Sequence, residues 1–154
     1  MPWRRCGSNA DVIFADTSFL LSLAGNDTNS PAAVARAETL GGPIVITALN
    51  RLEFENAIAL LRFRRAMPEA EASAARGAFK ADEEAGRITE MVCDWPEVMV
   101  EALRISRAYA EQEGHRVVDI LHVATALQLK AEEFLSFDKL QRDLGVAEGL
   151  TVGP

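Results

Sequence analysis

The segment that most restricts the fold of this chain is residues 117–127, with the sequence Val-Val-Asp-Ile-Leu-His-Val-Ala-Thr-Ala-Leu. It is apolar almost all the way round a helix, which is typical of a helix buried inside a protein. The exception is Asp119, near the first turn. Burying an ionised carboxylate costs much free energy unless a cation or hydrogen-bond donors meet it. Asp119 therefore either belongs to a structural network or lines a cavity that holds a positive charge.

Short apolar runs alternate with helical stretches along the whole chain. Strands are predicted at residues 12–15, 44–46, 88–92, 133–137 and 150–152. Helices are predicted at 18–24, 30–40, 49–66, from Pro68 to about Gly86, at 94–113, at 117–127 and in a short stretch ending at Gly145. This alternation predicts an α/β fold with a parallel sheet covered by helices. Residues 1–10 are expected to form a flexible N-terminal arm ahead of a single domain, residues 11–154, because no linker or repeat divides the rest.

Composition limits the class of protein. The net charge of −7 argues against a protein that holds nucleic acid with a blanket of positive charge, but it leaves room for a nuclease whose acids gather at a metal centre. No apolar run reaches the ~20 residues that a membrane-spanning helix needs, and the first residues lack the apolar core of a signal peptide. Cys6 and Cys93 have no metal-site spacing, so we expect reduced thiols in a cytoplasmic protein.

Four acids occupy positions that point to one edge of the predicted sheet. Asp16 and Asp138 each follow a predicted strand directly, where the chain turns into a helix. In open parallel sheets such positions face the crevice at the carboxyl ends of the strands. Glu53 lies one turn into the helix after the second strand, and Asp119 lies in the first turn of the helix before the fourth. We therefore expect the four carboxylates to converge.

Converging carboxylates need a counter-charge. Two carboxylates about 5 Å apart repel by roughly 3 kcal/mol at an effective dielectric near 20. A bound Mg²⁺ or Mn²⁺ would remove this cost, since hard cations prefer carboxylate oxygens and water. Such a centre can activate water and stabilise charge on a phosphoryl oxygen, which suits hydrolysis of a phosphodiester. The acids alone are a weak indication, because the chain contains 23 Asp and Glu residues.

The acids become specific through the segments that carry them. These are Phe-Ala-Asp-Thr-Ser-Phe-Leu at 14–20, Ile-Thr-Ala-Leu-Asn-Arg-Leu-Glu at 46–53, the Asp119 segment at 116–127 and Phe-Leu-Ser-Phe-Asp at 134–138. In this order they resemble the PIN-domain nucleases, most closely the VapC-like toxins of toxin–antitoxin pairs. Asp16 matches the family's acid after the first strand, Glu53 the acid after the second, Asp119 the third acid and Asp138 the acid after the fourth strand.

The resemblance implies a three-layer α/β/α fold with a five-stranded parallel sheet. It also implies a Mg²⁺- or Mn²⁺-dependent endoribonuclease, commonly a homodimer, whose metal and catalytic residues are the four acids. Its partners would be an RNA substrate and a cognate antitoxin that wraps the enzyme and blocks the acidic site.

Each acid also has a structural interpretation. Asp commonly caps a helix N-terminus, which would account for Asp16 and Asp138, and Lys139 stands beside Asp138 to offset its charge. Asp119 lies where a helix dipole favours a carboxylate, but this does not explain its apolar setting. Glu55 would point about 200° away from Glu53 on a helix, so only one of them can face the cleft.

The buried stripe of the same helix is predicted from its apolar residues, and Glu53 adjoins this stripe. The predicted residues are Leu49, Leu52, Ala57 and Leu60. Neighbours of the acids have two interpretations each. His122 is assigned to packing or hydrogen bonding rather than to metal binding. Arg116 either positions an RNA phosphate or is a surface charge, and Thr17 and Ser18 either bond to the acidic site or cap a helix. The basic cluster at 62–65 would contact RNA, an antitoxin or only water.

Other functions remain for the same sequence. A catalytically silent PIN-like binding scaffold would be expected to lack an acid, and all four are present. A non-toxin PIN nuclease in RNA processing would share the same site. An aspartyl-phosphate phosphatase would use Asp16 as nucleophile, but such enzymes usually carry a second Asp two residues on, where this chain has Ser18.

Overall fold

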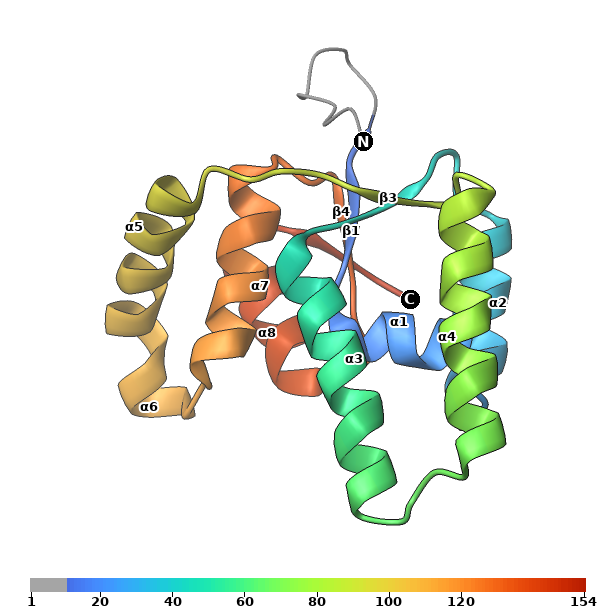
Figure 1. Ribbon diagram of the computed structural model, residues 1–154. Helices are drawn as coiled ribbons and strands as arrows, with labels where there is room; N and C mark the ends of the chain where they lie inside the picture. The colour runs from blue at the N-terminus through green and yellow to red at the C-terminus, as the bar shows by residue number, and fades with distance from the viewer. Residues whose placement is uncertain (1–10) are drawn as a thin grey trace.

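The computed structural model describes residues 11–154, so the arm expected over residues 1–10 lies outside the described residues (Figure 1). Five strands form one parallel sheet in the order β3-β2-β1-β4-β5. They are β1 (Ile13–Ala15), β2 (Ile44–Ile46), β3 (Ile88–Glu90), β4 (Glu133–Leu135) and β5 (Thr151–Gly153). The five-stranded parallel sheet is confirmed, and β1 and β4, which precede Asp16 and Asp138, are neighbours.

Helices cover both faces of the sheet, which gives the expected three layers (Figure 1). One face packs against α1 (Thr17–Ala24), α2 (Ser30–Glu38), α3 (Ala48–Phe63) and α4 (Glu69–Glu84). The other packs against α5 (Trp95–Ile105), α7 (Val117–Gln128) and α8 (Lys139–Ala147). Successive strand residues serve opposite cores, as the pleat of a strand requires: Ile13 and Ala15 belong to the first core and Phe14 to the second. No helix within residues 11–154 has the length and apolar character needed to cross a bilayer.

The helix predicted over residues 94–113 is present, but it is not α-helical throughout. Asp94 caps α5 by accepting the Glu97 N–H at 3.2 Å. After α5 the chain passes through a π-helical segment, Ser106–Ala110, into the short α6 (Glu111–Glu113). Gly114 ends this stretch with φ 72°, a left-handed conformation that favours glycine.

The predicted buried stripe of α3 is wrong. Leu52 is 67% exposed and Leu60 is also exposed, whereas the buried residues are Asn50, Phe54 and Ile58. These three residues are four positions apart, close to one helical turn, and so lie on one face of the helix. The face begins with the polar Asn50, so the pattern of apolar residues alone does not predict it. Asn50 can be buried because its amide is hydrogen-bonded to Thr47 and to the Ala15 carbonyl of β1. Glu53 sits beside this stripe and remains partly open to solvent.

Candidate active site

Three of the four predicted acids line a single cleft. Glu53 from α3, Asp119 from α7 and Asp138 after β4 border a space of about 380 Å³. The rest of the lining comes from Thr17, Ser18, Leu21, Arg116, Val117, Val118, His122 and Gln141. Asp16 does not line this cleft. It is fully buried and hydrogen-bonded to Ser18, so it lies directly behind one of the lining residues.

Asp16 is held by three hydrogen-bond donors at the end of β1. Its Oδ1 accepts the Ser18 hydroxyl at 2.7 Å and the Phe19 N–H at 2.9 Å, and its Oδ2 accepts the Ser136 hydroxyl at 2.6 Å. Burial raises the pKa of Asp16, and these hydrogen bonds offset the rise only in part. The Phe19 contact makes Asp16 the N-cap of α1, which is the structural role predicted for this residue. Ser136 Oγ also accepts the Asp138 N–H at 3.0 Å and thereby links the ends of β1 and β4.

Glu53 has two partners inside the cleft. Its Oε2 accepts the Thr17 hydroxyl at 2.7 Å and a short hydrogen bond from His122 Nε2. Burial acts to raise the pKa of Glu53, but the hydrogen bond and charge of His122 outweigh it and the pKa is lowered. Glu55, by contrast, is exposed and pairs with Arg76 at 2.7 Å, so Glu53 rather than Glu55 faces the cleft.

A chain of hydrogen bonds fixes which nitrogen of His122 carries the proton. The Thr47 N–H and hydroxyl both donate to Asn50 Oδ1, at 2.8 and 2.9 Å. The Asn50 amide nitrogen therefore faces the Ala15 carbonyl at 2.8 Å and His122 Nδ1 at 3.5 Å. Because an amide NH₂ only donates, Nδ1 is the acceptor and the proton sits on Nε2. His122 thus donates to Glu53 even in its neutral form, and its assignment to hydrogen bonding rather than to metal binding is consistent with this geometry.

Asp119 is fully buried and paired with Arg116. The guanidinium donates from Nε to Oδ2 and from Nη2 to Oδ1, both at 2.9 Å, and the Arg116 backbone N–H adds a contact of 3.2 Å to Oδ2. The same Nη2 lies 3.7 Å from Asp138 Oδ2. Lys139 does not offset Asp138 as expected, because its ammonium pairs with Asp143 one turn along α8, at 2.5 Å. Asp138 caps α8 by accepting the Gln141 N–H at 3.1 Å.

The donor chemistry of the cleft fits a hard divalent cation, since its acids offer only carboxylate oxygens. Within residues 11–154, however, no three His, Cys, Asp or Glu side chains are grouped so as to hold a metal ion as they stand. Each acid is engaged by the chain itself. Serines bind Asp16, His122 binds Glu53, Arg116 binds Asp119, and the Gln141 N–H donates to Asp138. A cation entering here would have to compete with these contacts.

Sequence reasoning missed the role of Arg116 as a partner of Asp119. The signal was present, since residues three apart on a helix are neighbours. The contact between His122 and Glu53 had no comparable signal, because 69 positions separate the two residues and only the packing of α3 near α7 brings them together.

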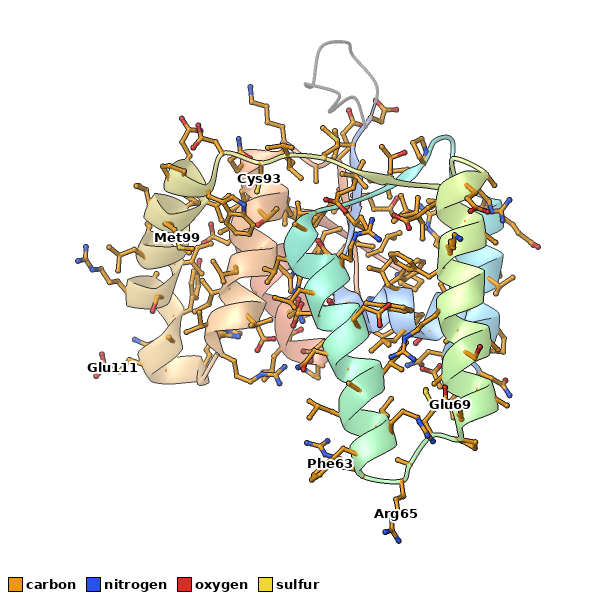
Figure 2. All side chains as sticks on the ribbon, viewed as in Figure 1. Phe63, Arg65, Glu69, Cys93, Met99 and Glu111 are labelled. Carbon is orange, nitrogen blue, oxygen red and sulfur yellow. The ribbon has the colours of Figure 1, made fainter. Side chains whose placement is uncertain are left out.

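The basic cluster at the end of α3 lies away from the sheet. Figure 2 shows Phe63 and Arg65 at the tip of the α3–α4 hairpin. Arg62 is engaged within the hairpin, with Nη1 donating to the Met67 carbonyl at 2.9 Å and Nη2 lying 2.8 Å from Glu69.

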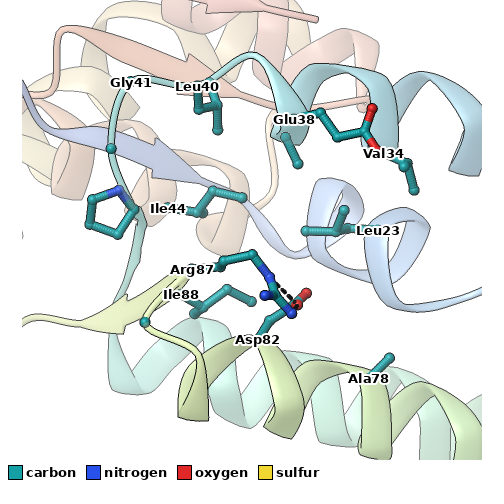
Figure 3. A pocket seen from close by; sticks show the side chains of 14 residues that line it. Leu23, Val34, Glu38, Leu40, Gly41, Ile44, Ala78, Asp82, Arg87 and Ile88 are labelled. Atoms are coloured by element: carbon teal, nitrogen blue, oxygen red, sulfur yellow. Dashed lines mark hydrogen bonds and ion pairs between the residues drawn. The ribbon is translucent and has the colours of Figure 1, made fainter.

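A larger hollow, of about 620 Å³, lies at the opposite edge of the sheet (Figure 3). Its walls come from α2, α4 and the amino ends of β2 and β3. It contains none of the four acids, and its Arg87 is already paired with Asp82, Nε to Oδ1 at 2.7 Å. The four predicted acids therefore lie in or behind the smaller cleft and not in this hollow.

The PIN domain family model matches residues 13–147, which is most of the chain. The chain therefore belongs to the PIN domain family, a family of nucleases. No curated protein sequence matches it.

Several solved structures share the fold of this chain. VapC20 of Mycobacterium tuberculosis, described as a sarcin-ricin loop cleaving toxin, has a TM-score of 0.64 and 18% identity over 90% of this chain and 96% of that one. FitAcB from Neisseria gonorrhoeae has a TM-score of 0.64 and 20% identity over 93% of this chain and 97% of that one. VapBC-1 from nontypeable Haemophilus influenzae has a TM-score of 0.62 and 14% identity, covering 92% and 96%. At these identities the likeness concerns the fold.

Proposed function

We propose that this protein is a Mg²⁺- or Mn²⁺-dependent endoribonuclease, the VapC-like toxin of a toxin–antitoxin pair acting in the cytoplasm. The observation that supports this best is the meeting of Glu53, Asp119 and Asp138, from three separate parts of the chain, in one cleft with Asp16 behind it. The proposed partners are an RNA substrate, a cognate antitoxin and a second copy of the chain. Relatives described as a toxin that cleaves the sarcin-ricin loop and as a VapBC complex favour this choice over a nuclease of RNA processing.

The four acids are the proposed ligands. A bound Mg²⁺ or Mn²⁺ would supply an activated water and stabilise charge on the phosphoryl oxygen. The chain's own contribution is to aim these acids. Ser18 and Ser136 hold both oxygens of Asp16, and His122 and Thr17 hold one oxygen of Glu53, which leaves its other oxygen free of side-chain partners within the described residues. Positioning of this kind lowers the entropic cost of bringing the reactants together.

The test is cleavage of total RNA by the purified protein, with and without Mg²⁺ or Mn²⁺, beside Asp119→Asn. We expect cleavage only with metal, and its loss in the variant. Asp143→Asn is the matched control, since Asp143 is an exposed acid on α8 outside the cleft. Circular dichroism and a melting curve establish that both variants are folded. Undiminished cleavage by Asp119→Asn would reject the site.

A catalytically silent scaffold is separated from the enzyme by metal titration followed by thermal melting. A cation that binds the folded state raises its stability, by about 2.7 kcal/mol at a hundred times its dissociation constant. If the wild-type melting temperature does not rise at millimolar Mn²⁺ and no RNA is cut, the scaffold is the better description.

A further inference from the structure

Arg116 stands between the solvent and the most deeply buried acid of the cleft. Asp119 is 0% exposed, whereas the Arg116 side chain is 71% exposed while gripping both carboxylate oxygens. The pair thus joins a fixed, buried anion to a cation on a long side chain that is largely in water. Because the Arg116 side chain is already largely in solvent, it can swing away from the pair. Asp119 is fixed inside the protein and cannot.

The charge of Arg116 acts on more than one acid. Its Nη2 lies 3.7 Å from Asp138 Oδ2, and its charge is among the influences that lower the pKa of Glu53. One guanidinium therefore faces the three acids that line the cleft. It stands in the place where a divalent cation would find its ligands.

Arg116 and a metal ion cannot both use Asp119 in full. A bidentate guanidinium occupies both carboxylate oxygens, and a divalent ion needs at least one of them. The two cations would also repel each other across a few ångströms. Metal binding at Asp119 therefore requires Arg116 to give up at least one of its hydrogen bonds.

We propose that Arg116 is an exchangeable counter-ion: it holds Asp119 in the metal-free protein, is displaced by the metal and then binds a phosphate of the RNA. This rests on the proposed function. A released guanidinium would remain at the rim of the cleft, and its planar fork suits phosphate oxygens as well as it suits a carboxylate. Arg116 thereby opposes binding of the metal alone and favours binding of metal and RNA together. Arg116 is a substrate-positioning residue in this scheme.

The test measures two affinities in Arg116→Gln, full-length chain. Calorimetry without RNA gives the dissociation constant for Mn²⁺, and steady-state cleavage of a synthetic RNA at saturating Mn²⁺ gives KM. We expect Arg116→Gln to bind Mn²⁺ at least about tenfold more tightly, yet to show a raised KM for RNA. Tighter Mn²⁺ binding together with weaker RNA binding identifies the counter-ion role, since loss of a merely structural residue would weaken both Mn²⁺ and RNA binding. Arg116→Lys keeps the charge but cannot form a bidentate pair with Asp119, so its Mn²⁺ affinity should lie between those of the wild type and Arg116→Gln. It replaces Arg116→Gln in the test if that variant does not fold.

Arg107→Gln is the control for the loss of one positive charge, because Arg107 is exposed on the π-helical segment and outside the cleft lining. It should leave both affinities unchanged. If the wild type cleaves RNA with Mn²⁺ but Arg116→Gln binds Mn²⁺ no more tightly, or keeps the wild-type KM, the counter-ion scheme is wrong and the proposed function stands. If the wild type neither binds Mn²⁺ nor cleaves RNA, the proposed function itself fails.

Discussion

Replacing Asp16 by Asn should change how the stability of the metal-free protein depends on pH. Asp16 is fully buried, and burial raises the pKa of its carboxyl above the ordinary 3.8 in spite of three hydrogen bonds. Above pH 3.8 the unfolded chain has lost this proton while the folded protein still holds it. The free energy of unfolding contributed by Asp16 therefore falls as the pH rises, by up to about 1.4 kcal/mol per pH unit for one proton. The fall ends where the buried carboxyl itself ionises.

The assay is urea unfolding of wild type and Asp16→Asn in EDTA between pH 4 and 8. The stability of the variant relative to the wild type should increase with pH and then level off. Glu53→Gln should show the opposite trend, confined to the acidic end of the range, because the pKa of Glu53 is lowered below its ordinary 4.5 and its stabilisation is lost as the pH falls through the folded pKa. Asp143→Asn is the surface control. If the stability of Asp16→Asn relative to the wild type stays flat, or falls as the pH rises, the serine hydroxyls outweigh burial.

Two further predictions concern the residues behind the acids. Ser136→Ala removes the 2.6 Å hydrogen bond to Asp16 and should lower the free energy of unfolding in EDTA by about 1.5–3 kcal/mol; in the Asp16→Asn background the loss should be smaller, and an equal loss would show that the bond to the charge is unimportant. Asn50→Ala leaves the Ala15 carbonyl and His122 Nδ1 without their donor and should cost about 1–3 kcal/mol in urea unfolding. Its metal-dependent cleavage should fall further than stability explains, because His122 is then free to take the other tautomer; wild-type kcat in a folded variant would contradict this.

The fold followed from the sequence because short, largely apolar runs bounded by clear turns alternate with helical stretches. The strand Ile44–Ile46, for example, follows Gly41-Gly42-Pro43 and is buried throughout. Positions directly after strands likewise placed Asp16 and Asp138 at the carboxyl edge of the sheet, and the structure adds that their strands are neighbours. What failed was the orientation of α3, since its buried stripe begins with a polar residue, Asn50, whose partners come from elsewhere in the chain. The π-helical segment at Ser106–Ala110 had no sequence signal that we recognise.

The charge balance of the cleft changes what a metal has to do there. On the sequence alone, converging carboxylates required a bound cation to offset their repulsion. The structure instead provides internal partners: Arg116 for Asp119 and, in part, for Asp138, and His122 for Glu53. Repulsion of roughly 3 kcal/mol per close pair is thus offset before any metal arrives, so the metal-free protein should be stably folded. Under the proposed function, a metal would then be needed for chemistry rather than for folding, and its affinity would reflect competition with Arg116 as much as attraction by the acids.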